Sequence, residues 1–406
     1  MNYIERTIER TLSRTAGEFP AVVLTGPRQS GKTTTLKHLF SENHRYVSVE
    51  PPDVRLAAAT DPRGFLEFYK PPVIIDEVQH APELLPYIKE RIDADRDKPG
   101  QYILSGSQNL LLVERIGETL AGRAAVLRLL PLSLKELRGC KNEPLLASAT
   151  KSNAGAVFPA FSDLWKIVLR GFYPEIAADK KRDAQLWHSS YLQTYIERDV
   201  RTLRQIGDLM TFQTFLSALA ARNGQLLNMT ELSRDIGVSQ NTSKAWLAAL
   251  EASYQVIVLR PYYRNIGKRL VKSPKVYFTD TGTLCSLSGI SDIEQLSKGP
   301  MAGAIFETVV LMEIIKHETH HGRVPKVYFW RTADGAEVDI IYESNGSIIP
   351  IEVKLSATPN PAMTAGIAKF RQAYGGLAAV GNGYIVHPGD VALPMGGVLA
   401  LPVGRM

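Results

Sequence analysis

The chain has 406 residues, of which 45% are hydrophobic and 22% are charged, and 47 Lys and Arg against 41 Asp and Glu give a formal net charge of +6. These proportions are those of ordinary globular proteins, and the length suits two to three domains, which excludes wholesale disorder, collagen and a coiled-coil rod. The two cysteines, Cys140 and Cys285, lie far apart without a C-x-x-C pattern, so neither a disulfide framework nor a Cys-rich zinc site is expected.

The N-terminal stretch MNYIERTIERTL is charged and amphipathic, whereas a secretory signal would be apolar. No apolar run approaches the roughly 18–20 residues that a membrane helix needs. We therefore expect a soluble, cytoplasmic protein that does not contact a membrane.

The first motif is a phosphate-binding loop. AVVLT at positions 21–25 predicts a strand, and GPRQSGKT at positions 26–33 leads from it into the helical pattern TTLKHLF. Glycines at Gly26 and Gly31 let the backbone fold closely around an anion, and the N–H groups of the loop and of the helix start then point at phosphates. We expect Lys32 to neutralise the β- and γ-phosphates of ATP and Thr33 to bind Mg²⁺. The expected ATP-binding residues are Gly26, Pro27, Arg28, Gln29, Ser30, Gly31, Lys32, Thr33 and Thr34.

An acidic pair follows the next strong strand signal, PPVIIDEVQ. The apolar residues 73–75 predict a buried parallel strand that ends at Asp76 and Glu77. The carboxyl ends of such strands are where α/β sheets hold ligands. We expect Asp76 to help hold Mg²⁺ and Glu77 to orient and deprotonate the water that attacks the γ-phosphate.

A third strand, in QYILSGSQN, ends in polar side chains. Among these, Ser107 and Gln108 are the expected sensors of the γ-phosphate or of the attacking water. A helical stretch from position 108 to 122 then ends at Arg123, after which AAVLRLLPL is again typical of a strand.

The order of these motifs makes the resemblance specific. GPRQSGKTT, VIIDEVQ, LSGSQN, LAGR, LLPLS, GFYPE, YIERDV, VDIIY and IEVK together resemble the prokaryotic AAA-type ATPases of the STAND-related archaeal ATPase group, over nearly the whole chain. In AAA+ ATPases an arginine at the end of this helix reaches the nucleotide of the neighbouring subunit, so the resemblance implies that Arg123 is a catalytic finger. Arg115 and Arg128 lie close enough to serve instead. A finger that acts in trans implies a homo-oligomer, for example a hexameric ring.

Two further stretches belong to the expected lid. GFYP at positions 171–174 resembles the family's G-x-P element that touches adenine. Arg198 and Arg201 in YIERDVR fit either a lid sensor or a charged amphipathic helix with internal ion pairs.

A helix-turn-helix is predicted next. In MTELSRDIGVSQNTSKAWLAAL, Gly237 sits where the turn needs a permissive backbone, and Ser239 can cap the second helix. Residues 254–259 and 275–278 predict two paired strands. Together these elements predict a winged helix.

The winged-helix region carries the basicity of the chain. Positions 241–275 hold seven Lys and Arg against one acid, an excess equal to that of the whole chain. Such a concentration favours a polyanionic partner, and we expect contact with the backbone of DNA, including branched or single-stranded forms. The alternative is a surface for another subunit or for the lid. The expected DNA-binding residues are Lys244, Arg264, Lys268, Arg269 and Lys272.

From about position 299 the pattern resembles the PD-(D/E)xK nuclease core. An amphipathic helix in AIFETVVLMEIIKH carries Glu307, a strand in EVDIIYES carries Asp339, and a strand in IIPIEVKLS carries Glu352 and Lys354 on one face. In that family the acids bind Mg²⁺ at a phosphodiester and the lysine positions or activates water. The chain has Val338 where the family has proline, and such domains also serve as binding modules without cleavage.

These predictions combine into one architecture. The fold class is α/β, with a P-loop AAA-type parallel sheet core (1–140), a helical lid (141–212), a winged helix-turn-helix (213–285) and a restriction-endonuclease-like α/β domain (286–406). The expected function is a Mg²⁺-dependent ATPase that acts on DNA as a helicase, translocase or branched-DNA remodeller. The alternatives are a nucleotide-gated switch or scaffold and an ATP-regulated DNA nuclease.

Overall fold

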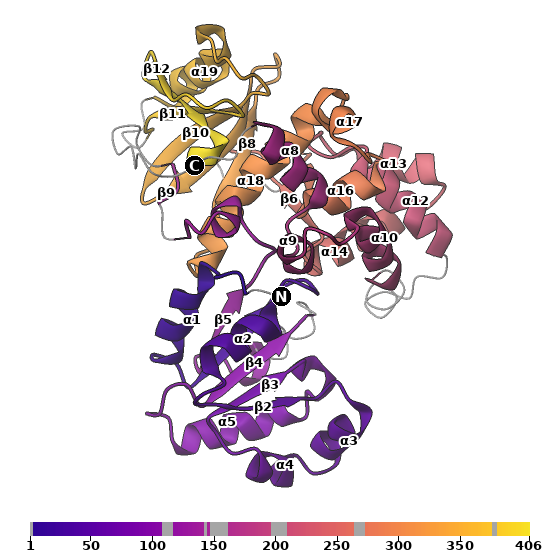
Figure 1. The fold of residues 1–406 in the computed structure, drawn as a ribbon, viewed down its shortest axis with the longest axis vertical. Helices are drawn as coiled ribbons and strands as arrows, with labels where there is room; N and C mark the ends of the chain where they lie inside the picture. Colours follow the sequence, from indigo (N-terminus) through magenta and orange to yellow (C-terminus); the bar gives the residue numbers. More distant parts are fainter. Residues whose placement is uncertain are drawn as a thin grey trace.

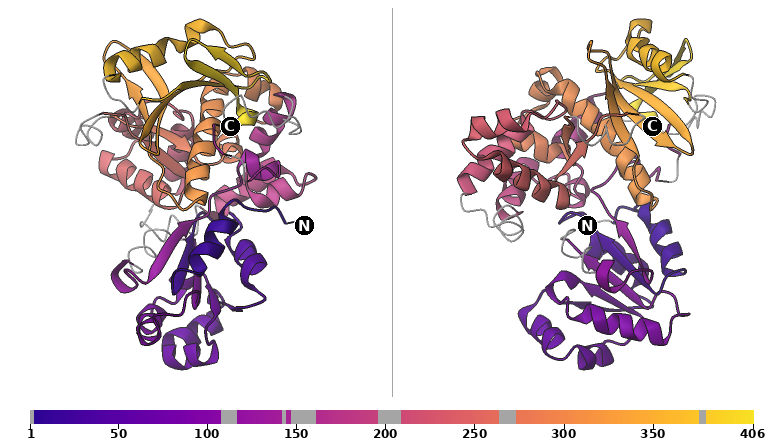
Figure 2. Two further views of the ribbon diagram at one scale, coloured as in Figure 1. Left: turned by 90° about the vertical axis from the view of Figure 1, so that its left-hand side faces the viewer. Right: turned by 180° about the vertical axis from the view of Figure 1, so that it is seen from behind.

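A computed structural model describes residues 3–107, 117–141, 144–146, 161–195, 209–263, 273–375 and 380–406. The chain folds into an N-terminal lobe, drawn lowest in Figure 1, and a larger upper part in which a C-terminal sheet lies beside a group of helices. The described chain starts at the junction between these parts, and the two further views in Figure 2 show the same division.

The N-terminal lobe is built on a parallel five-stranded sheet. Its strands lie in the order β2-β3-β4-β1-β5, so β4 separates the strand before the glycine-rich loop from the strand that ends in the acidic pair. The bounds are β1 (Ala21–Thr25), β2 (Arg45–Ser48), β3 (Val73–Asp76), β4 (Tyr102–Gly106) and β5 (Ala124–Arg128). The helices are α1 (Ile8–Ala16), α2 (Lys32–Phe40), α3 (Pro52–Thr60), α4 (Pro62–Phe68) and α5 (Leu84–Ala94), with the 3₁₀ helix η1 (Val78–His80).

Both faces of this sheet are buried. Along β1, Ala21 and Val23 belong to one hydrophobic cluster, whereas Val22 and Leu24 belong to another on the opposite face. A strand buried on both faces has a continuous apolar sequence, which is why AVVLT and VII carry no polar alternation. The parallel α/β core predicted from these runs is confirmed.

The central part of the chain is mainly helical. It contains α7 (Leu134–Leu137), α8 (Phe161–Arg170), α9 (Pro174–Ala178), α10 (Ala184–Tyr195), α12 (Leu209–Ala220), α13 (Met229–Ile236), α14 (Gln240–Ala252), α16 (Thr281–Leu287) and α17 (Ile293–Lys298), with the antiparallel pair β6 (Val256–Leu259) and β7 (Lys275–Phe278). Gly237 ends α13 in the left-handed conformation, with φ 74°, and the Ser239 side chain accepts a hydrogen bond from the Thr242 N–H at the start of α14. Both local predictions for the two-helix unit are confirmed.

The C-terminal sheet has six strands in the order β12-β13-β11-β10-β9-β8. The bounds are β8 (Val327–Arg331), β9 (Glu337–Ser344), β10 (Ser347–Val353), β11 (Gly383–His387), β12 (Leu393–Met395) and β13 (Val398–Pro402). The pairs β8–β9 and β9–β10 are antiparallel, and β10–β11 is parallel. The helices are α18 (Ala302–His320) and α19 (Ala365–Tyr374), with the 3₁₀ helices η3 (Pro361–Thr364) and η4 (Val403–Arg405).

Helix α18 is buried on nearly all sides, so the expectation of an amphipathic helix is wrong. Its polar residues Glu313, Lys316 and His320 are as inaccessible as its aliphatic ones. The helix lies in a hydrophobic core that it shares with α8, α10, α12 and the two-helix unit, where Trp165 contacts Phe306. Figure 1 shows it running from the C-terminal sheet down to the N-terminal lobe. Among the described helices, none is both long enough and apolar enough to cross a membrane.

Candidate functional site

The glycine-rich loop connects β1 to α2 in a shape that needs glycine at two positions. Gly26 has φ 146°, and a Cβ there would lie 2.1 Å from the Leu129 carbonyl oxygen. Gly31 has φ 92° and precedes the first turn of α2. Lys32 is buried, and its ammonium donates hydrogen bonds to the carbonyls of Gly26 (3.1 Å) and Pro27 (2.9 Å). The lysine charge is therefore held against the loop that would cradle phosphates.

Asp76 gathers three hydroxyl groups at the carboxyl edge of the sheet. The Thr33 hydroxyl donates to its carboxylate at 2.8 Å, the Tyr46 hydroxyl donates to the same oxygen at 2.8 Å, and the Ser105 hydroxyl donates to the other oxygen. Hydroxyl and carboxylate oxygens are the ligands that Mg²⁺ prefers, so Thr33 and Asp76 fit the predicted magnesium site. Tyr46 was not predicted, because nothing in RYVS distinguishes it from an ordinary strand residue.

Glu77 follows Asp76 in a left-handed backbone conformation, with φ 57°. Its carboxylate accepts hydrogen bonds from the Gln79 amide and, at 3.2 Å, from the Ser107 hydroxyl beyond the end of β4. The predicted base and one of the two predicted sensors are thus in contact. Gln108, the other predicted sensor, lies outside the described residues.

A cavity of about 300 Å³ adjoins the loop. The loop and α2 contribute Gln29, Gly31 and Thr34 to its lining, and the opposite wall includes Pro174 of α9. The GFYP element therefore lies beside the loop, in a place that suits the base of a nucleotide. The N-terminal residues Tyr3, Ile4 and Arg6 also line this cavity, a contribution that the sequence analysis missed.

Arg123 lies at the amino ends of the parallel strands, opposite the glycine-rich loop. It directly precedes β5, whose first residue pairs with the first residue of β1, so it is about 16 Å of strand away from the loop of its own chain. Its guanidinium forms two hydrogen bonds with Asp93 of α5, at 2.6 and 2.9 Å. Arg128, by contrast, ends β5 and lies over the Tyr254 ring at 4.6 Å. Arg123 therefore lies too far from the loop of its own chain to contact a nucleotide there, and Arg115 lies outside the described residues.

We call α18, the six-stranded sheet and α19 the C-terminal lobe. The four residues of the nuclease-like pattern line one cavity of about 480 Å³ in this lobe. They come from α18 (Glu307), from β9 (Asp339), from β10 (Glu352) and from the residue that follows β10 (Lys354). The Lys354 ammonium lies 2.6 Å from the Glu352 carboxylate and 3.5 Å from that of Asp339. The expected shared face of Glu352 and Lys354 is confirmed.

The cavity is also lined by charged residues that the sequence analysis did not assign to it, among them Lys275 and Glu337. Lys275 of β7 reaches in from the central part of the chain, and its ammonium lies 2.6 Å from Glu337 and 3.4 Å from Glu307. Lys275 is only 4% exposed. Its sequence position marked it only as one cation of a basic stretch, because no local pattern reports a partner that lies in another part of the fold.

In the described arrangement, lysines hold the acids of this cavity. Within the described part of the chain, no three His, Cys, Asp or Glu side chains form a group able to hold a metal ion. Burial raises the pKa of Glu352, and the nearby Asp339 carboxylate adds to the increase. Burial likewise raises the pKa of Glu307, which also accepts a hydrogen bond from the Tyr277 hydroxyl.

The expected DNA-binding residues are described only in part. Lys244 lies on α14 and is exposed. Arg264, Lys268, Arg269 and Lys272 lie outside the described residues, as do the lid arginines Arg198 and Arg201.

Comparison with protein families agrees with the geometry of the N-terminal lobe. Residues 18–138 match the family described as AAA domain. Residues 161–294 and 302–406 match two families described as domains of unknown function, DUF8612 and DUF4143. The N-terminal lobe, with its glycine-rich loop facing an acidic strand end, is a P-loop ATPase domain of the AAA type.

Two curated relatives extend the likeness to the whole chain. Uncharacterized proteins of Mycobacterium tuberculosis and Mycobacterium bovis are each 30% identical to it, over 97% of this chain and 82% of theirs. The chain therefore belongs to the same family as these two mycobacterial proteins. An uncharacterized protein of Haemophilus influenzae is 21% identical, over 89% of each chain. Among solved structures, a Walker-type ATPase of Pyrococcus abyssi aligns with a TM-score of 0.46 and 15% identity, over 70% of this chain and 96% of that one.

Proposed function

We propose that this protein is a Mg²⁺-dependent ATPase that acts on DNA as a helicase, translocase or branched-DNA remodeller. The DNA part of the proposal depends mainly on one observation, which is that Glu307, Asp339, Glu352 and Lys354 line one charged cavity. The helix and strand order around it, α18-β8-β9-β10-α19-β11, resembles the PD-(D/E)xK core, whose substrates are nucleic acids. A module of that kind in the same chain as an ATPase domain favours DNA as the object of ATP hydrolysis.

The roles proposed in ATP hydrolysis follow from the contacts of the N-terminal lobe. Lys32 and the loop N–H groups would bind the phosphates, and Thr33 and Asp76 would hold Mg²⁺, which neutralises phosphate charge when bound. Glu77 would orient the attacking water and accept its proton, while Gln79 and Ser107 fix its carboxylate. Arg123 would act on the nucleotide of a neighbouring subunit, which requires a homo-oligomer and release of Asp93.

The two-helix unit offers a further DNA contact. Helices α13 and α14 with the pair β6–β7 resemble a winged helix, and Lys244 is exposed on the second helix. Lysines and arginines there would pair with backbone phosphates, so binding would weaken steeply as salt is raised. We expect Lys244→Glu to lower DNA affinity and to flatten its dependence on salt.

The proposal is tested by measuring ATP turnover with single-stranded, duplex and branched DNA side by side, together with the mass of the protein in solution. We expect DNA to stimulate turnover, Lys32→Ala to abolish it, and Glu77→Gln to bind ATP without hydrolysing it. Equal turnover with and without DNA would refute the DNA part. Nucleotide-dependent assembly without any DNA effect would instead favour a switch or scaffold.

An ATP-regulated nuclease is a second candidate function, favoured by the same cavity. In the described arrangement Lys275 and Lys354 hold the acids, so we assign no metal-dependent step. The test is cleavage of plasmid DNA with Mg²⁺ or Mn²⁺ by the wild type and by Asp339→Ala. Cutting that disappears in the variant would establish the activity, and cutting that persists would come from a contaminant.

A further inference from the structure

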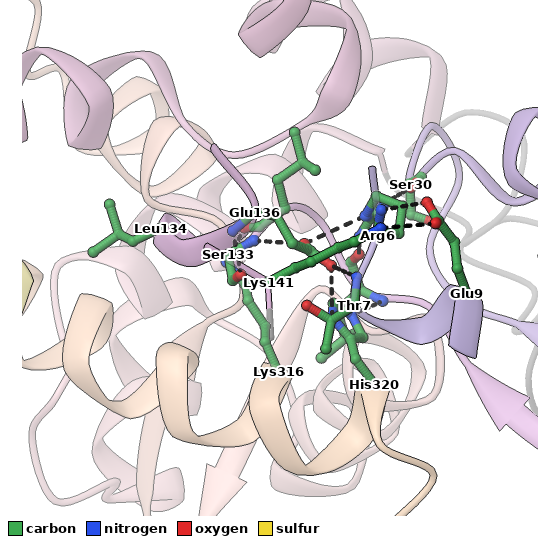
Figure 3. Close-up of polar contacts among 12 residues, drawn as sticks. Arg6, Thr7, Glu9, Ser30, Ser133, Leu134, Glu136, Lys141, Lys316 and His320 are labelled. Atoms are coloured by element: carbon green, nitrogen blue, oxygen red, sulfur yellow. Dashed lines mark hydrogen bonds and ion pairs between the residues drawn. The ribbon is translucent and has the colours of Figure 1, made fainter. Parts of the chain in front are cut away.

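A buried arginine lies directly behind the phosphate-binding loop. Arg6 is 2% exposed, and its guanidinium donates hydrogen bonds to the carbonyls of Ser30 (2.8 Å) and Leu130 (2.6 Å). Figure 3 shows it between the loop and Glu136, whose carboxylate lies 3.3 Å from the Arg6 Nε. Ser30 directly precedes Gly31, so this contact fixes a carbonyl of the loop itself. The rigid fork of arginine can hold several acceptors at once, which the single ammonium of a lysine cannot do in the same geometry.

Glu136 is the group that keeps Arg6 in place. Its carboxylate also accepts hydrogen bonds from the N–H groups of Thr7 (2.7 Å) and Ser133 (2.9 Å). Burial alone would raise the pKa of Glu136, but the Arg6 guanidinium and His320 hold it well below its usual range. The glutamate is therefore ionised, and it joins the N-terminal segment to the linker that follows β5.

His320, the last residue of α18, completes the network from the C-terminal lobe. Its Nε2 accepts the Leu130 N–H at 3.2 Å, which leaves the proton on Nδ1, 3.3 Å from the Glu136 carboxylate. Burial lowers the pKa of His320, in keeping with this neutral form. One and two turns earlier, Lys316 donates to the Leu132 carbonyl (2.7 Å) and Glu313 accepts from the Leu134 N–H (2.9 Å).

We propose that Arg6 is a positioning residue of the nucleotide site and that α18 holds it there through His320 and Glu136. This inference rests on the proposed binding of ATP at the loop. Arg6 holds the Ser30 carbonyl and thereby sets the direction of the neighbouring N–H groups that would face the phosphates. The nucleotide site is then complete only when α18 is docked against the N-terminal lobe. The N-terminal lobe depends on the C-terminal half for its affinity, although no residue of α18 lines the cavity beside the loop.

The test uses the full chain and three single variants. Arg6→Lys keeps the charge but loses the fork. His320→Gln keeps an acceptor for the Leu130 N–H but loses the ring Nδ1–H that faces the Glu136 carboxylate. His321→Gln is the matched control, because His321 is the next residue and its ring contacts His317 instead of the network. The dissociation constant of a fluorescent ATP analogue is measured together with KM and kcat for Mg²⁺–ATP.

A positioning role and a merely structural role change different quantities. If Arg6 positions the loop, Arg6→Lys raises KM and the dissociation constant about tenfold or more, and kcat changes less than threefold. If Arg6 only stabilises the fold, the variant has fewer active molecules, so kcat falls and KM stays constant. That second result, or a His320→Gln variant that binds the analogue as tightly as His321→Gln, would overturn the proposal.

The double variant Arg6→Lys/His320→Gln tests whether both residues act through Glu136, and binding by the wild type tests the proposed function on which this inference rests. Because Arg6 and His320 act through one carboxylate, we expect their combined effect to be smaller than the product of the single effects, and multiplicative effects would contradict the proposed chain of contacts. Should Arg6→Lys give no folded protein by circular dichroism, His320→Gln alone decides the outcome. Failure of the wild type to bind the analogue would refute the proposed function, whereas equal binding by all variants would refute only this inference.

Discussion

Replacing Lys275 with alanine should destabilise the C-terminal lobe far more than removal of a surface lysine. The change leaves Glu307 and Glu337 without an ammonium that lies 3.4 and 2.6 Å away, at a site where the lysine is 4% exposed. Breaking one partner of a buried ion pair costs about 3–5 kcal/mol, because the remaining charge is left unpaired. Here Glu337 keeps Arg331 at 3.1 Å and Glu307 keeps the Tyr277 hydroxyl, so the lower end, about 3 kcal/mol, is expected.

The assay is thermal unfolding by scanning calorimetry with Lys298→Ala as the matched control. Lys298 also forms an ion pair, with Glu294 at 2.9 Å, but its side chain is 75% exposed, so its loss should cost less than about 1 kcal/mol. A loss of about 3 kcal/mol in the free energy of unfolding corresponds to a fall in Tm of about 6–12 °C for a cooperative unit of roughly 150–250 residues. Adding Glu307→Gln to Lys275→Ala should restore part of the loss. If the Tm of Lys275→Ala lies within 2 °C of that of Lys298→Ala, the carboxylates of Glu307 and Glu337 do not depend on Lys275 and the reasoning is refuted.

Two further predictions concern an acid-sensitive histidine and the loop glycine. Burial lowers the pKa of His317 to about 3, whereas the unfolded chain has about 6.5, so the unfolded state takes up the proton first and stability is lost as pH falls below 6.5. Between pH 7.5 and 5.5 we expect the free energy of unfolding, measured with urea, to fall by about 1 kcal/mol more in the wild type than in His317→Asn. An equal pH dependence of both proteins would contradict the lowered pKa of His317. Gly26→Ala should abolish retention of an ATP analogue, because its Cβ would meet the Leu129 carbonyl oxygen at 2.1 Å. Gly139→Ala, also at positive φ but with no atom within 4 Å of its Cβ, should cost about 1 kcal/mol and leave binding unchanged, and a similar loss in both variants would show that strain alone is responsible.

Elements with a local signal were predicted closely from the sequence. The strands Ala21–Thr25 and Lys275–Phe278 have the predicted bounds, because a run of β-prone residues ends at a glycine, proline or polar residue on each side. The contact of Glu352 with Lys354 follows from the period of a strand. The resemblance to a family added the order of the modules, which no periodicity gives.

Residues whose partners are distant in sequence were missed for a physical reason. Tyr46 contacts Asp76, and Lys275 contacts Glu337, across gaps that only the finished fold closes. A pattern of hydrophobic and polar residues also treats every charge as solvated. That assumption failed for α18, whose Lys316 is buried because it binds a backbone carbonyl of the linker.

Helix α18 connects the C-terminal cavity to the phosphate-binding loop. Glu307 and His320 are thirteen residues apart on α18, or about 20 Å along a helix axis, and one faces the C-terminal cavity while the other bonds to the linker behind the loop. A helix buried along its whole length moves as a rigid element, since its core neighbours leave no space for independent ends. A shift that repacks one end must therefore displace the other or break the hydrogen bonds there, and those bonds satisfy buried charges that are costly to expose. The ATPase lobe is thus physically tied to the C-terminal lobe through α18, in addition to contacts such as the hydrogen bond from the Arg138 guanidinium to the Gly404 carbonyl.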